Sequence, residues 1–157
     1  MSAPHELVYH QQIPLPLEQV FPFFSNAANL ETITPPWVGF EILTPQPIEM
    51  REGALIDYRI RLHGLPLRWR TRITVWDPPH RFVDEQIRGP YTLWRHEHRF
   101  EANAEGTRMT DRIEYRIALD WMPGAGLVHR FFVRPDLERI FGYRREALAK
   151  ALGFQAD

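Results

Sequence analysis

The chain has 157 residues, of which 44% are hydrophobic and 25% are charged, and its formal net charge is −1. These values are typical of one soluble globular domain, and they give no overall attraction to nucleic acid or anionic lipid. The absence of cysteine excludes disulfides, cysteine-ligated zinc and thiol nucleophiles. Because no signal peptide or long apolar stretch is found, we expect a single cytoplasmic domain over residues 1–157 with no integral membrane association.

The first part of the chain predicts a strand followed by two short helices. Residues 5–13 alternate between apolar and polar side chains, as a strand with one buried face does. Residues 16–33 then predict two short helices, with Pro16 near the start and Asn26 as a cap between them. Pro35 ends the second helix.

From Val38 onward, apolar side chains recur at every second residue, which predicts strands joined by hairpin-length turns. Connections of this length join antiparallel neighbours, so the strands should pair in sequence order. The expected strands cover residues 38–44, 54–64, 65–76, 81–87, 91–101 and 106–119. Residues 135–152 end the pattern as one helix, with Pro135 at its first position and one apolar stripe.

Seven antiparallel strands, an early helix pair and one long terminal helix predict an α+β fold. In this fold the curved sheet wraps around the C-terminal helix. A curved sheet that grips one helix does not fill both ends of its core with side chains, so we expect a pocket between sheet and helix.

The stretch YTLWRHEHRFE, residues 91–101, places two histidines on the buried face of a strand. Side chains alternate along a strand, so His96 and His98 share a face with Trp94 and Phe100. The opposite face carries three charged side chains and faces water. The two imidazoles therefore point into the interior.

The turn lengths predict which acids meet these histidines. With residues 102–106 as a loop, Asp84 should lie opposite His96, and His96 opposite Asp111. The diagonal neighbours of this row are Gln86 and His98. Two carboxylates beside one imidazole favour its charged form, so we expect the pKa of His96 to lie above its free value of about 6.5. A slip of two residues would keep the faces and change the partners.

Three interpretations of this polar row remain open. It can be a structural cluster in which all polar groups satisfy one another. It can be the polar end of an apolar pocket, where the carboxylates fix the tautomer and raise the basicity of the imidazole. It can also be a metal site, because His-x-His opposite an acid can bind zinc or iron. The further ligands that such sites have downstream are missing, so we expect no metal and no other cofactor.

The predicted outer face of the sheet is rich in arginine, which could suggest a nucleic-acid platform. Carboxylates such as Glu85 and Glu114 are interleaved with the arginines, and the aromatic side chains lie on the opposite face. This composition is typical of a solvated, salt-bridged surface, so no nucleic-acid partner is expected.

Three stretches, residues 29–42, 82–101 and 106–117, resemble the START and birch-pollen-allergen-like (SRPBCC) superfamily. They are most similar to its bacterial polyketide cyclase/dehydrase-like proteins, whose subgroup pattern D-E-Q…G-P-Y…W-x-H-x-H-x-F is present here. The resemblance extends from about residue 5 to residue 152. It implies a helix-grip fold with a deep hydrophobic cavity for a lipid, a polyketide or another aromatic small molecule. Because the superfamily includes both cyclases and carriers, it implies no particular activity.

Two functions follow from these observations. The first is a protein that binds or carries a hydrophobic small molecule between the sheet and helix 135–152. The alternative is a cyclase or dehydratase, in which His96 moves a proton and Asp84 or Asp111 orients it, while His98 or Tyr115 polarises a carbonyl. The residues expected to line the pocket are Tyr58, Trp69, Thr71, Gln86, Trp94, His96, His98, Tyr115, Ile140, Phe141 and Arg144. These side chains could instead simply fill a core.

Two apolar loops have no assigned role in this scheme. Trp37 follows two prolines, and residues 121–126 form an apolar segment with two glycines. Such loops can gate the mouth of a pocket, bury against a second subunit in a homodimer, or pack under the fold.

Overall fold

The computed structural model describes residues 3–156, and it confirms the predicted α+β class. The first elements are β1 (His5–Ile13), α1 (Leu17–Phe24), α2 (Asn29–Ile33) and the short 3-10 helix η1 (Pro36–Val38). Five long strands follow a very short one: β2 (Glu41–Ile42), β3 (Leu55–Leu62), β4 (Leu65–Asp77), β5 (Arg81–Arg88), β6 (Tyr91–Asn103) and β7 (Gly106–Ile117). The chain then forms α3 (Ala125–Val128), the π-helix η2 (His129–Val133) and α4 (Arg134–Leu152).

The strands form one antiparallel sheet in the order β1-β7-β6-β5-β4-β3-β2. Most connections are hairpins between sequence neighbours, as predicted. The last strand, β7, also pairs with the first strand, so that β1 lies at the edge of the sheet opposite β2. The strand expected at residues 38–44 is reduced to η1 and β2, because Pro35 and Pro36 favour a turn of 3-10 helix there.

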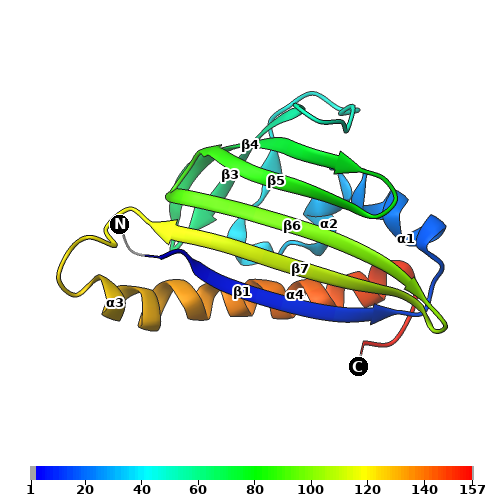
Figure 1. The fold of residues 1–157 in the computed structure, drawn as a ribbon. Coiled ribbons are helices and arrows are strands. Elements are labelled where there is room, and N and C mark those ends of the chain that lie inside the picture. The colour runs from blue at the N-terminus through cyan, green and yellow to red at the C-terminus, as the bar shows by residue number, and fades with distance from the viewer. Residues whose placement is uncertain (1–2, 157) are drawn as a thin grey trace.

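Helix α4 lies along the sheet (Figure 1). It packs on the sheet through two groups of buried side chains. Near its C-terminal end, Leu148 belongs to a core with Phe21 and Phe100. Nearer its N-terminal end, Leu137 and Phe141 belong to a second core with aromatic side chains of the sheet. Helix α2 also packs against α4, and α1 and α3 lie toward opposite ends of the molecule. Among residues 3–156, the helices include none long and apolar enough to cross a membrane.

The hairpin between β6 and β7 corrects the predicted register. Asn103 pairs with Gly106, so only two residues form the turn, and the Asn103 side chain accepts a hydrogen bond from the Glu105 backbone N–H at 3.1 Å. Gly106 has φ +129°, and an added Cβ would collide with the backbone of Ile13. The strands therefore continue through residues that were expected to be loop, and the pairing shifts by two positions.

The consequence for the polar row is direct. Asp84 lies opposite His96, as predicted. Asp111, however, lies opposite His98, and His96 lies opposite Ile113. The predicted pairing of His96 with Asp111 in the ladder is therefore wrong, although the faces are unchanged.

Candidate functional site

A cavity of about 190 Å³ lies between the sheet, α4 and the α1–α2 segment. Strands β3, β4, β5 and β6 contribute its wall, and α4 contributes Leu137, Ile140, Phe141 and Arg144. Most lining side chains are apolar or aromatic, while Asp84, His96, His98 and Arg144 supply its charged or titratable corner.

Nine of the eleven side chains expected at the pocket lie on the cavity lining: Tyr58, Trp69, Thr71, Trp94, His96, His98, Ile140, Phe141 and Arg144. Gln86 lies elsewhere, because its amide donates to the Tyr91 carbonyl at 2.6 Å and accepts from the Tyr91 N–H at 3.1 Å. Tyr115 is fully buried, and its hydroxyl lies 2.6 Å from Nε2 of His129. Burial raises the pKa of Tyr115 to about 12. Its hydroxyl is thus not placed to polarise a carbonyl in the cavity.

Aromatic rings form one wall of the cavity. Trp69 stacks on Tyr58 at a centroid distance of 5.7 Å and meets Trp94 edge to face at 5.3 Å. Tyr91 contacts both tryptophans, at 5.7 Å from Trp69 and 4.9 Å from Trp94. These contacts hold the rings in fixed orientations, as aromatic pairs of this geometry do.

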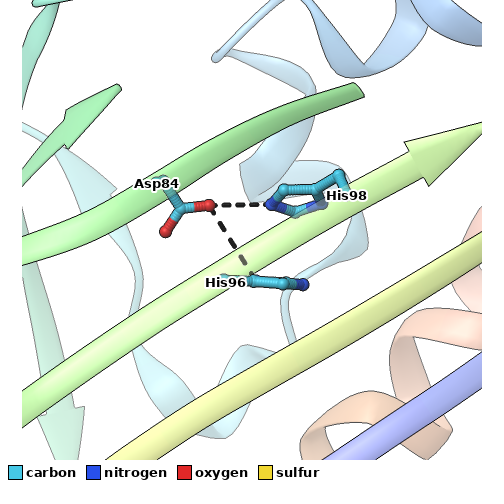
Figure 2. A group of neighbouring side chains, drawn as sticks. All are labelled: Asp84, His96 and His98. Atoms are coloured by element: carbon cyan, nitrogen blue, oxygen red, sulfur yellow. Dashed lines mark hydrogen bonds and ion pairs between the residues drawn. The ribbon is translucent and has the colours of Figure 1, made fainter. Parts of the chain in front are cut away.

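The polar corner is a cluster of two imidazoles and two carboxylates. Nε2 of His96 lies 2.7 Å from Oδ1 of Asp111, and Nε2 of His98 lies 2.7 Å from Oδ2 of Asp84. Two longer contacts complete the cluster, 3.2 Å from His98 Nδ1 to Asp111 Oδ1 and 3.9 Å from His96 Nδ1 to Asp84 Oδ2. Figure 2 shows Asp84 presenting one oxygen to both rings. Of the two acids, Asp84 lines the cavity and Asp111 lies behind the histidines.

The carboxylates are ionised despite their burial. Burial raises the pKa of Asp111, but the charge of Arg144 and the hydrogen bonds from both histidines outweigh it, and the pKa falls well below its usual value. For Asp84, burial is likewise outweighed by the hydrogen bond from His98 and the nearby cations, so its pKa is lowered. An ionised carboxylate only accepts, so the imidazoles donate in both short hydrogen bonds.

The pKa values of the two imidazoles are shifted in opposite directions. Burial lowers the pKa of His96, and the neighbouring His98 lowers it further, which Asp111 and Asp84 do not offset. The expected rise in the pKa of His96 is therefore wrong. Burial also lowers the pKa of His98, but its hydrogen bonds to Asp111 and Asp84 outweigh burial and raise that pKa. The corner thus pairs an imidazole held neutral with one that favours its charged form.

Asp84, His96 and His98 could also hold a metal ion, because each offers one ligand atom and these atoms lie within 4.8 Å of one another. In the structure Nε2 of His98 and Nδ1 of His96 both face Oδ2 of Asp84, at 2.7 and 3.9 Å. An ion bound through His98 Nε2 would have to displace the proton of the short bond between His98 and Asp84. The geometry therefore favours a proton-sharing cluster.

Sequence reasoning missed the part of the lining that comes from the two short helices. Phe24, Ala27 and Ile33 face the cavity from this segment, and Leu30 joins them. The spacing of apolar residues in α1 indicates one buried face. That this segment covers the open side of the curved sheet follows only from the tertiary structure.

Comparisons with known proteins agree with this architecture. The family model described as polyketide cyclase / dehydrase and lipid transport matches residues 13–140. A search of curated proteins gave no match. Among solved structures, protein Ms6760 from Mycobacterium smegmatis is 17% identical with a TM-score of 0.69, and the alignment covers 94% of this chain and 90% of that one.

Two further structures share the fold at low identity. Ara h 8.0201 is 12% identical with a TM-score of 0.65, over 95% of this chain and 97% of that one. The ginseng major latex-like protein 151 from Panax ginseng is 12% identical with a TM-score of 0.55, over 88% and 97%. These likenesses show that the chain shares its fold, an antiparallel sheet with a long C-terminal helix, with these three proteins. Because the family model spans most of the sequence, the chain belongs to the polyketide cyclase / dehydrase and lipid transport family.

Proposed function

We propose that this protein binds a hydrophobic small molecule, such as a lipid, a polyketide or an aromatic compound, as a binder or carrier. The observation that supports this most is the cavity, whose lining combines aromatic and aliphatic side chains with one polar corner. Small-molecule sites have this composition. The volume of about 190 Å³ is below the roughly 300 Å³ of drug-sized sites, so the ligand is compact.

Native mass spectrometry of the purified protein tests this proposal. We expect a species heavier than the chain by the mass of one small molecule, which organic solvent releases for identification. Protein denatured and refolded without ligand is the control, and it should take up the extracted molecule again. If the purified chain has only its own mass and binds nothing from a lipid and aromatic extract, the proposal fails.

A second candidate function is acid–base catalysis on a carbonyl-containing substrate, such as an aldol cyclisation or a dehydration. The observation that favours it is the opposite shift of the two imidazole pKa values at the cavity wall. Titratable groups whose environments separate their pKa values are suited to act as a base and an acid. Neutral His96, which donates from Nε2 to Asp111, would accept the proton at Nδ1, and the positive charge of His98, held by Asp84, would stabilise the charge that develops on the carbonyl oxygen.

The substitution His96→Ala separates the two functions. If the protein is an enzyme, this variant should still bind the molecule identified by mass spectrometry but convert it at least about a hundredfold more slowly. His10→Ala, on the exposed side of β1, is the matched control and should leave turnover unchanged. Unchanged turnover in His96→Ala would remove His96 from the mechanism.

A further inference from the structure

A groove of about 290 Å³ lies on the outer face of the sheet, where residues 43–45 run beside β3. Arg68 and Arg70 on β4 alternate with Trp69, which is buried on the cavity side, so both arginine side chains point to the opposite face. Arg88 on β5 lies opposite Arg70 in the ladder. These three arginines line the groove, which is called the arginine groove below.

The positive charge of the arginine groove is only partly neutralised. Within residues 3–156, Asp57 on β3 is the only carboxylate of its lining, and both carboxylate oxygens already accept hydrogen bonds from Arg70, at 2.7 and 3.0 Å. In the part of the chain that the structure describes, Arg68 and Arg88 make no hydrogen bond and no ion pair. Like charges directly opposite one another on a sheet repel, so the placement of Arg88 opposite Arg70 costs free energy that a bound anion would recover.

The donors that remain in the arginine groove fit a phosphate group. Three guanidinium groups and one carboxylate leave a charge of +2, which a phosphate monoester matches with its charge of about −1.5 to −2 near pH 7. A guanidinium group presents a planar fork of N–H donors that binds phosphate oxygens in pairs. The Thr44 hydroxyl accepts from the Asp57 N–H at 2.7 Å, which leaves its own proton to donate. Leu55, which is 44% exposed, adds an apolar side chain to the same lining.

We propose that the arginine groove binds a small phosphate monoester. Its phosphoryl oxygens accept hydrogen bonds from Arg68, Arg88 and the Thr44 hydroxyl, and its carbon skeleton contacts Leu55. The arginine groove and the cavity lie on opposite faces of the sheet, so this site is independent of what the cavity binds.

Phenyl phosphate is the probe, and titration calorimetry of the full chain at about pH 7.5, where the probe is a dianion, measures its affinity. We expect the double variant Arg68→Gln with Arg88→Gln to bind the probe at least about tenfold more weakly than the natural chain. The pair Arg72→Gln with Arg108→Gln is the matched control, because it removes the same charge from exposed positions outside the groove. This pair should change the affinity by less than about twofold.

Benzoate tests the chemical class of the anion. It carries one negative charge and two acceptor oxygens, so it should bind at least about fivefold more weakly than phenyl phosphate. No binding of phenyl phosphate by the natural chain, equal binding by the Arg68→Gln/Arg88→Gln variant, an equal loss in the control pair, or equal affinity for benzoate would each overturn the phosphate site.

A cavity variant separates this site from the proposed function. Ile140→Trp places a larger side chain in the cavity and should leave the affinity for phenyl phosphate unchanged. If Ile140→Trp abolishes binding of the probe, the probe occupies the cavity and the phosphate site is overturned. The bound mass in native spectra tests the cavity alone, so either site can fail while the other stands.

Discussion

His96 and His98 lie side by side on β6 with their ring centroids 3.7 Å apart, yet each makes its short hydrogen bond to a different carboxylate. The bond from His96 reaches Asp111 on β7, and the bond from His98 reaches Asp84 on β5. A charge on one ring disfavours a charge on the other at this distance. The four groups therefore titrate as a coupled unit that holds one extra proton more readily than two.

This coupling predicts the order in which the two imidazoles titrate. Under the influence of Asp84 and Asp111, His98 should titrate above about pH 6.5 and His96, which is buried and lies beside His98, below it. Long-range proton–nitrogen spectra of the ring nitrogens between about pH 4 and pH 9 measure both transitions. Single substitutions of each histidine assign the signals. An order in which His96 retains its proton to higher pH would contradict the described network.

The raised pKa of His98 makes the free energy of unfolding depend on pH. Because the pKa of His98 is raised in the folded state, its stabilising contribution is complete below the unfolded value of about 6.5 and is lost as the pH rises through the folded value. The free energy of unfolding should therefore fall over this interval, and His98→Gln should flatten the fall. His10→Gln, at an exposed site on β1, should leave it unchanged.

The substitution His98→Leu should destabilise the protein more than His96→Leu. His98 contacts both acids at 2.7 and 3.2 Å, whereas His96 has one short bond of 2.7 Å and a contact of 3.9 Å. Loss of His98 leaves two buried carboxylates short of a partner, and we expect a cost of about 2–4 kcal/mol. Urea unfolding at about pH 6, where His98 is charged, measures it. A larger cost for His96→Leu would show that the short bond to Asp111 dominates the cluster.

Arg144 should govern the acid limit of stability. Its charge is the largest favourable influence on ionised Asp111, whose pKa is lowered despite burial. A carboxylate with a lowered pKa stabilises the fold above its unfolded value and ceases to do so as the pH falls through its folded value. Arg144→Met should therefore move the midpoint of acid unfolding to higher pH. Arg145→Met, on the next position of α4, is the control and should move it less.

Filling the cavity should abolish ligand binding without unfolding the chain. Ile140 lines the cavity from α4 and is only partly buried, so Ile140→Trp places a larger apolar side chain in its space. We expect loss of the bound mass in native spectra with a change in stability of about 1–3 kcal/mol or less. Glu146→Trp, at an exposed position of the same helix, should retain the ligand. Binding that survives in Ile140→Trp would place the ligand elsewhere.

Exposed apolar side chains in the chain segment that links β7 to α4 predict self-association. Trp121 is 79% exposed, and Phe131 and Phe132 are 62% and 60% exposed. Exposed apolar patches of this kind usually mark a contact surface. We expect sedimentation to detect a homodimer at micromolar concentration and Phe131→Glu with Phe132→Glu to dissociate it. Trp37→Glu tests the other loop, where the indole already packs on Tyr143. A monomeric natural chain would exclude the homodimer.

The local sequence determines which side chains of a strand face the interior and where the last helix begins and ends. The alternation in residues 91–101 places His96 and His98 on the buried face, because strand geometry assigns faces without reference to partners. The predicted helix at residues 135–152 matches α4 within one residue, because Pro135, the apolar stripe and Gly153 are signals that lie within the helix or at its ends.

The tertiary structure decided the chemistry of the site. The shift of Asp111 from His96 to His98 depends on a two-residue turn at Gly106, whose backbone closely approaches Ile13 on another strand. The opposite pKa shifts of the two histidines depend on burial and on the distances between four side chains from three strands. Alternation fixes the direction of each side chain, because that is a property of the local backbone. Distances across the sheet are fixed only when turns, strands and helix pack together, because each depends on the register of the whole.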